Sequence, residues 1–163
     1  MMKTELYHCI TSIDVKKLNE DDKEELLRIF MITKNDLIRN QLAFIFSDLH
    51  YEKAIPYIIK KINDKSVFHN NGSLVHALED FDLKRYFIPL VKIICEHDYE
   101  PRLMAYGIVQ RIAPSISKGI RTKALTILET YRLTVEQTAI DRGENSTLHF
   151  IEKTKELLSI LKG

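Results

Sequence analysis

Apolar residues recur at spacings of three and four positions along most of this chain, the period of one face of an α-helix. One stripe follows Asn35 and consists of Leu37, Ile38, Leu42, Ile45, Phe46 and Leu49. The next stripe consists of Ile55, Ile58, Ile59 and Ile62. This spacing predicts an all-α protein whose helices each bury one side.

Two of the predicted helix pairs repeat about 32 residues apart. The first pair covers residues 40–49 and 54–62, and the second covers 72–81 and 87–94. Leu42, Phe46 and Leu49 fall in register with Leu74, Leu78 and Phe81. A period of this length predicts stacked helical hairpins. Such stacks usually leave a long surface free to bind another macromolecule.

Capping residues set several helix boundaries. Asn19 and Asn35 are predicted N-caps, because an asparagine side chain accepts from the free amides of the first turn. Pro56 fits the first turn of its helix, and Ser73 is the predicted cap of a short helix over 74–81. Further helices are predicted over residues 100–112, 117–133 and 146–161, and a short strand is arguable only over 5–13.

Two short motifs carry a family resemblance. Asp36-Leu-Ile-Arg39 is followed by Ala43, and Glu100-Pro-Arg102 is followed by Ala105. They are similar to the acidic-x-x-Arg…Ala opening of the second helix in HEAT units. The chain therefore resembles HEAT-like and armadillo-like repeat proteins, although the second hairpin has Gly72-Ser-Leu-Val-His76 where that arginine would stand.

The resemblance implies a right-handed α-α superhelix of HEAT-like helical hairpins. It implies a single domain over residues 1–163, with a repeat core at about 20–132 and C-terminal capping helices over 133–163. The ends of the chain depart from the repeat, as expected of the caps that a short solenoid needs.

Charge is balanced in total but uneven along the chain. The 24 basic and 23 acidic residues give a net charge of +1, so no global field favours a polyanion. Residues 79–100 are mainly acidic, whereas residues 101–132 are mainly basic. The basic residues there are Arg102, Arg111, Lys118, Arg121, Lys123 and Arg132. The pattern fits either solvated helix faces or a bipolar surface whose acidic part suits a basic protein partner.

The sequence contains no recognisable catalytic or metal-binding motif. His76 and Glu79 share a helix face, but two ligands are too few for a metal site. A solvated loop is a better interpretation of His97, Asp98 and Glu100 than an acid–base or metal site. Cys9 and Cys95 are the only cysteines, so no zinc-binding pairs exist. We predict no enzyme activity, catalytic residue, cofactor, metal or small-molecule substrate.

The sequence has no apolar run of the length expected for a signal peptide or a membrane span. Two lone cysteines are typical of a reducing compartment. The expected location is the cytoplasm, without a membrane partner.

A second resemblance concerns the segment over residues 71–82, which is similar to part of small bacterial HEAT-like proteins. Some of these are immunity proteins, which neutralise a neighbouring cell's toxin, such as a contact-dependent growth inhibition effector. The resemblance implies a protein partner, namely the basic C-terminal domain of a toxin. A nuclease is the favoured kind of toxin. The acidic side chains would mimic phosphates, and His76 and Tyr99 would add desolvated contacts. The predicted partner-binding residues are His76, Glu79, Asp80, Asp82, Asp98, Tyr99 and Glu100.

Two alternatives remain open at the level of sequence. One is a nucleic-acid-binding helical repeat, similar to HEAT-like DNA glycosylases, that uses the basic stretch over 102–132. This alternative is less favoured, because no aromatic residues interleave with Lys118, Arg121 and Lys123. The other is a general scaffold for protein complexes, which the sequence does not separate from an immunity protein.

Overall fold

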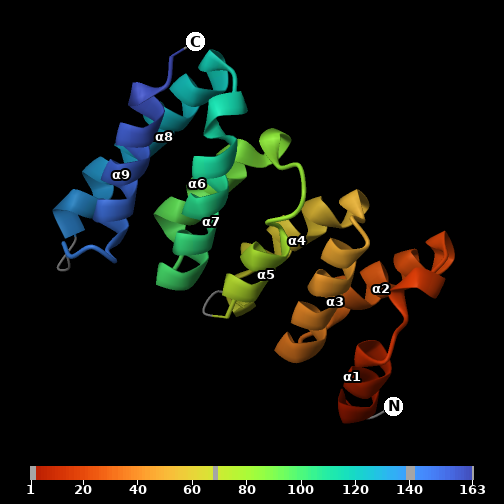
Figure 1. Ribbon diagram of the computed structural model, residues 1–163. Coiled ribbons are helices and arrows are strands. Elements are labelled where there is room, and N and C mark those ends of the chain that lie inside the picture. The colour runs from red at the N-terminus through yellow and green to blue at the C-terminus, as the bar shows by residue number, and fades with distance from the viewer. Residues whose placement is uncertain (1–2, 68–69, 139–141, 163) are drawn as a thin grey trace. The chain divides into compact units, whose positions relative to one another are not determined.

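The computed structural model describes residues 3–67, 70–138 and 142–162 (Figure 1). Within those ranges every regular element is helical, which confirms the predicted all-α class. The chain divides into two compact units, Met1–Phe81 and Asp82–Gly163.

Unit 1 is built around one central helix. Helix α3 packs against α1, α2 and α5, and α4 packs against α5 (Figure 1). The α-helices of unit 1 are α1 (Lys3–Thr11), α2 (Glu20–Ile32), α3 (Asp36–Asp48), α4 (Ile55–Ile62) and α5 (Gly72–Ala77). The short 3-10 helices are η1 (Val15–Lys17), η2 (Glu52–Ala54) and η3 (Lys65–Val67).

The caps of α2 and α3 are those that the sequence predicts. The Asn19 side chain accepts from the Asp22 backbone N–H at 2.8 Å, and the Asp22 carboxylate accepts from the Asn19 N–H in return. This reciprocal arrangement is a capping box. The Asn35 side chain accepts from the Ile38 N–H at 3.1 Å, and Pro56 lies in the first turn of α4. Residues that favour these local geometries therefore help to fix the starts of α2, α3 and α4.

Several local predictions in unit 1 are wrong. The strand that is arguable over residues 5–13 does not form: Lys3–Thr11 is helical, and it packs against α3 with Ile10 buried. The helix predicted over 74–81 runs instead from Gly72 to Ala77, so Ser73 lies inside it. The cap position is Asn71, whose amide donates to the Ile62 carbonyl. Leu37 is also 62% exposed and is not part of the buried stripe.

Unit 2 is centred on α6, which packs against α7, α8 and α9. Its α-helices are α6 (Phe87–Glu96), α7 (Tyr99–Ile112), α8 (Lys118–Thr138) and α9 (Thr147–Ile160). Two 3-10 helices, η4 (Lys84–Tyr86) and η5 (Ala113–Ser115), precede α6 and follow α7. Helix α8 runs through residue 133, where the sequence predicts the start of the capping helices.

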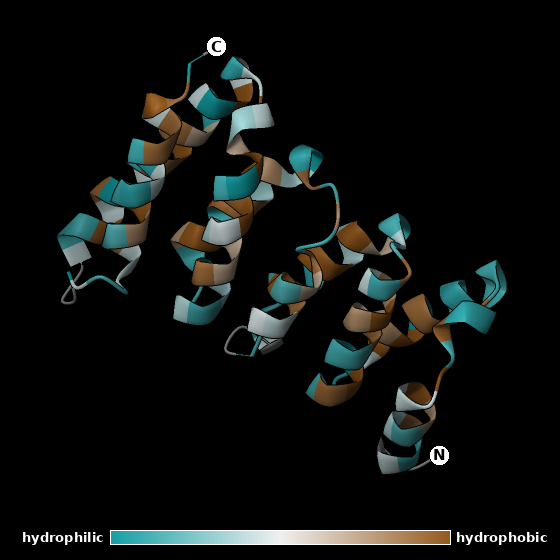
Figure 2. Ribbon diagram, viewed as in Figure 1, coloured by the Kyte–Doolittle hydropathy of each residue, from teal (hydrophilic) through white to brown (hydrophobic). Residues whose placement is uncertain are grey.

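Each unit has its own apolar core. Fully buried side chains of unit 1 include Phe30, Leu42, Phe46, Ile58, Ile62 and Leu74. Those of unit 2 include Leu83, Phe87, Leu90, Ile94, Leu128 and Ile151. Figure 2 shows hydrophobic and hydrophilic positions side by side on the helices, as expected of amphipathic helices that pack on one side. No helix in the described ranges combines the length and the hydropathy needed to cross a membrane.

Candidate partner-binding surfaces

Three of the predicted partner-binding residues lie at the end of unit 1. His76 is exposed on α5, and its Nδ1 lies 3.2 Å from Oε2 of the half-buried Glu79. The His76 ring also contacts Phe44 edge-on, with 6.0 Å between ring centroids. Asp80 follows in the exposed turn after α5. His76 and Glu79 therefore form a surface pair that an aromatic ring holds in place.

The other four residues belong to unit 2, where they do not form one cluster. The exposed Asp82 precedes η4 and accepts from the Lys84 backbone N–H at 3.2 Å. Asp98 is the N-cap residue of α7. Helix α6 separates them, and its ten residues span about 15 Å at the usual helical rise. A partner that contacts both residues has to reach along the length of α6.

Asp98, Tyr99 and Glu100 form a compact group at the start of α7. All three are exposed, and the Tyr99 side chain retains 43% of its accessible surface. Its ring meets Phe150 of α9 edge-on, with centroids 6.2 Å apart. Leu103, one turn further along α7, is also exposed. The group thus combines an apolar and aromatic surface with two flanking carboxylates.

Phe150 is the residue of this group that the sequence did not identify. It is buried, and it contacts Tyr106 as well as Tyr99. Phe150 lies 51 positions after Tyr99 on a different helix. In the sequence, Phe150 is recognisable only as one of the apolar residues of α9. That position does not indicate which aromatic ring Phe150 contacts.

Arg102 is buried in unit 2 and binds the backbone. Only 6% of its surface is exposed. Its guanidinium donates to the carbonyl oxygens of Ile94, His97 and Asn145 at 3.2, 2.6 and 2.8 Å. It also donates to Oγ1 of Thr147 at 2.6 Å. The side chain thereby ties the turn between α6 and α7 to the start of α9.

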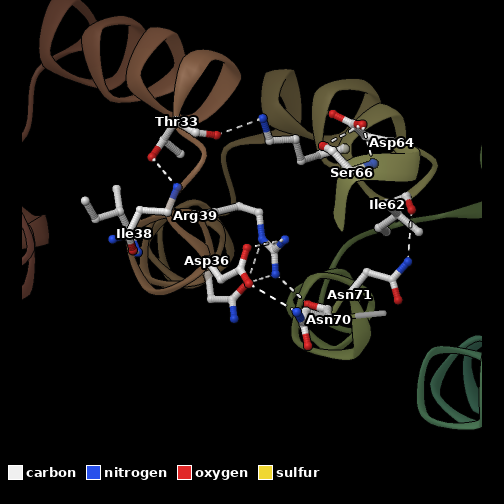
Figure 3. Close-up of polar contacts among 12 residues, drawn as sticks. Thr33, Asp36, Ile38, Arg39, Ile62, Asp64, Ser66, Asn70 and Asn71 are labelled. Atoms are coloured by element: carbon white, nitrogen blue, oxygen red, sulfur yellow. Dashed lines mark hydrogen bonds and ion pairs between the residues drawn. The ribbon is translucent and has the colours of Figure 1, made fainter. Parts of the chain in front are cut away.

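Arg39 has an equivalent role in unit 1 (Figure 3). It is 1% exposed, and its Nη1 donates to Oδ1 of Asp36 at 3.2 Å. Its Nε and Nη2 donate to Oδ1 of Asn40, and Nη2 also donates to the Asn70 carbonyl. Asn70 in turn donates to Asp36 at 3.3 Å. This buried arginine joins α3 to the segment before α5.

The basic stretch over 102–132 is not a continuous cationic surface. Arg102 is buried, and so is Arg121, which donates to the Ile116 carbonyl at 2.7 Å. Arg132 is bound to carboxylates of α8 and α9. The exposed basic side chains of the stretch are Arg111, Lys118 and Lys123. This distribution weakens the charge argument for nucleic-acid binding.

A network of ion pairs joins α8 to α9. Glu129 accepts from Arg132 at 2.7 Å and from Lys155 at 2.6 Å. These hydrogen bonds lower the pKa of the Glu129 carboxyl to about 2. Arg132 also pairs with Glu136 and Glu152 at 2.7 and 3.7 Å. The network stabilises the pairing of the two helices and uses charges that would otherwise be available to a ligand.

Cys95, in the last turn of α6, and His97, in the turn before α7, are both buried. Burial raises the pKa of the Cys95 thiol to about 12, so the reactive thiolate is scarce at neutral pH. His97 is 2% exposed, and burial lowers its pKa. The prediction that His97 lies in a solvated loop is therefore wrong, because its carbonyl binds Arg102 inside the turn. Among the described residues, no three potential ligands gather around a point where a metal ion would fit.

No family model, no curated protein and no solved structure matches this chain.

Proposed function

We propose that this chain is a non-catalytic protein-binding module, and specifically an immunity protein that binds and neutralises a basic bacterial toxin domain. The observation that carries the proposal is the group of Asp98, Tyr99 and Glu100. Tyr99 presents a large ring to solvent while Phe150 supports that ring from below. Supported tyrosines are frequent centres of binding energy, because they bury a large surface at a small cost in side-chain entropy.

The flanking carboxylates indicate the charge of the partner. Asp98 and Glu100 lie on either side of Tyr99, and the pair of His76 and Glu79 with Asp80 gives unit 1 an acidic surface of its own. Lysine and arginine side chains of a nuclease that normally bind phosphates would bind these carboxylates instead. Long-range attraction would speed association and make the rate sensitive to salt.

The proposed architecture is a right-handed superhelix of HEAT-like hairpins. Its support is the pair of buried arginines, Arg39 and Arg102, which are the residues that carry the resemblance. Each is almost inaccessible, and each binds a carbonyl far along the chain, at Asn70 and Asn145 respectively. A repeated structural role for the same motif is what a repeat family predicts.

Retention on heparin distinguishes the alternative, nucleic-acid binding, from the proposed binding of a toxin. A protein that binds phosphates through the 102–132 stretch would be retained on heparin at moderate salt. We expect early elution, because Arg102 and Arg121 are buried and Arg132 is bound to carboxylates. Retention that Lys118→Ala and Lys123→Ala abolish would favour the nucleic-acid alternative instead.

Growth rescue tests the immunity proposal. An immunity gene normally lies directly downstream of its toxin gene, so the C-terminal domain encoded by the upstream gene is the candidate toxin. That domain is expressed from an inducible promoter in a bacterial host, with and without this protein. The proposal predicts growth arrest that this protein relieves. An upstream domain that is not toxic, or whose toxicity this protein leaves unchanged, would contradict it.

A further inference from the structure

A groove lies in unit 1 between the C-terminal half of α2 and α4. Its volume is about 540 Å³, and its walls include Phe30 and Met31 of α2, Tyr57 and Lys60 of α4, and Asp64 just after α4. A second hollow of about 500 Å³ shares Met31 and Tyr57 with the first. Met31 and Tyr57 therefore contribute to the walls of both hollows.

Apolar side chains line the groove and face solvent. Met31 is 47% exposed and Tyr57 is 37% exposed. Apolar side chains that gather at a surface hollow, rather than lying scattered, mark sites of interaction. Methionine also adapts its shape to different ligands, because its side chain is unbranched and flexible.

The groove is held in shape by contacts that do not involve a ligand. Lys61 donates to the carbonyl oxygens of Met31 and Thr33 at 3.2 and 3.1 Å, which ties the end of α2 to α4. The inner wall is Phe30, which is fully buried and meets Phe46 edge-on with 5.8 Å between centroids. A preformed site of this kind loses little entropy when a partner binds.

The rim of the groove is cationic at the end where α2 and α4 terminate. Lys60 and Lys61 line it directly. The pKa of Asp64 is lowered mainly by its hydrogen bonds to Ser66 and, to a smaller extent, by the nearby charges of Lys61 and Lys34. Asp64 accepts from the backbone N–H and the hydroxyl of Ser66, at 3.0 and 2.8 Å. That carboxylate is therefore partly engaged, whereas the exposed Lys60 makes no ion pair with the part of the chain that the structure describes.

We infer that this groove binds a segment of a protein partner that combines an aromatic or aliphatic anchor with acidic neighbours. The anchor occupies the space between Met31 and Tyr57, and a carboxylate of the segment pairs with Lys60. The charge of the rim selects the occupant, because a basic segment would be repelled there. This site goes beyond the proposed function, since its charge is opposite to that of the Asp98–Glu100 group and it belongs to the other unit.

Selection from random peptides tests the inference, because the sequences that bind reveal the chemistry that the groove prefers. A library of random twelve-residue peptides on phage is selected against the full chain. It is counter-selected against a Tyr57→Ala, Lys60→Glu double variant. We expect recovered peptides to share an aromatic or aliphatic residue flanked by Asp or Glu. A synthetic peptide of that consensus should bind the wild-type chain and lose at least tenfold in affinity to Tyr57→Ala and to Lys60→Glu.

Matched controls separate the groove from general surface effects. Leu37→Ala removes an exposed apolar side chain of unit 1 outside the groove, and Lys16→Glu reverses an exposed charge on η1. Both should leave peptide affinity within twofold, and thermal melting should show that all variants are folded. Recovery of no groove-dependent peptides, or of peptides whose consensus is basic, would overturn the inference. Toxin neutralisation is measured separately, so failure here leaves the proposed function standing.

Discussion

The guanidinium of Arg102 donates to the backbone carbonyl of Asn145, which lies 43 residues further along the chain, at 2.8 Å. The same side chain binds the carbonyls of Ile94 and His97 and the Thr147 hydroxyl. One buried cation thus satisfies four oxygens at the junction of α6, α7 and α9. Backbone carbonyls inside a protein are costly to leave without a donor.

Removal of the Arg102 side chain should strongly destabilise the protein. We expect Arg102→Ala to lower the free energy of unfolding by about 3 kcal/mol or more, because charge-assisted hydrogen bonds are lost and buried acceptors remain. Arg102→Lys should recover only part of the loss, since an ammonium cannot copy the planar guanidinium. Urea denaturation followed by circular dichroism measures both.

Lys92→Ala is the control for Arg102→Ala, because it removes an exposed cation from α6. It should change the free energy of unfolding by no more than about 0.5 kcal/mol, as expected of an exposed site. Equal effects of Arg102→Ala and Lys92→Ala would show that the buried hydrogen bonds contribute little.

The two cysteines should react with thiol reagents at very different rates. Cys9 is exposed, whereas Cys95 is buried with a pKa raised to about 12. A folded sample treated with Ellman's reagent at pH 8 should release close to one equivalent quickly and the second only after denaturant is added. Cys9→Ser should remove the fast phase, and Cys95→Ser should preserve it. Rapid reaction of both thiols in the native protein would contradict the buried position of Cys95.

Protonation of the Glu129 carboxylate should lower the stability of the folded protein in acid. Its pKa is about 2 in the folded protein, below the ordinary value of 4.5. The carboxylate therefore stabilises the fold above about pH 4.5, and this contribution is lost progressively as the pH falls toward 2. Glu129→Gln should give a shallower decline in melting temperature between pH 5 and about pH 2.5 than the wild-type chain shows. Glu144→Gln, at an exposed turn position, serves as the control and should follow the wild-type profile.

The sequence predicts a structural feature correctly where a residue interacts only with its immediate neighbours. Asn19 and Asn35 cap their helices as predicted, because an N-cap interacts with amides only three positions away. The helix over Lys3–Thr11 was not predicted, although Leu6, Tyr7 and Ile10 have helical spacing. Its β-branched and aromatic residues also suit a strand, and packing against α3 resolves the ambiguity.

The candidate sites depend on contacts that a single sequence does not reveal. Arg39 and Arg102 were identified by their motifs, but not as buried side chains that bind distant carbonyls. Equally, no sequence pattern indicates that Phe150 supports Tyr99. The number of basic residues in the 102–132 stretch likewise overstates its positive surface charge. Arg102 and Arg121 are buried, and Arg132 is paired with carboxylates.

Partner binding should depend on the supported tyrosine and on the acidic residues. We expect Tyr99→Ala to weaken binding of the toxin domain by at least tenfold, because it removes a rigid aromatic contact from the surface. A double reversal, Glu79→Lys with Asp82→Lys, should weaken binding by more than tenfold through charge repulsion. Both variants should retain the wild-type melting temperature within a few degrees, because Tyr99 and Asp82 are exposed and Glu79 is half-buried.

Isothermal titration of the purified toxin domain, the C-terminal domain encoded by the upstream gene, measures directly whether this protein binds a toxin. We expect a one-to-one complex with the wild-type chain. The affinity should fall at least tenfold in Tyr99→Ala and stay unchanged in Leu133→Ala, which alters an exposed apolar position on α8. The absence of measurable heat and of a complex on gel filtration would contradict it. Unchanged affinity in both Tyr99→Ala and the charge-reversal variant would show that the partner binds elsewhere.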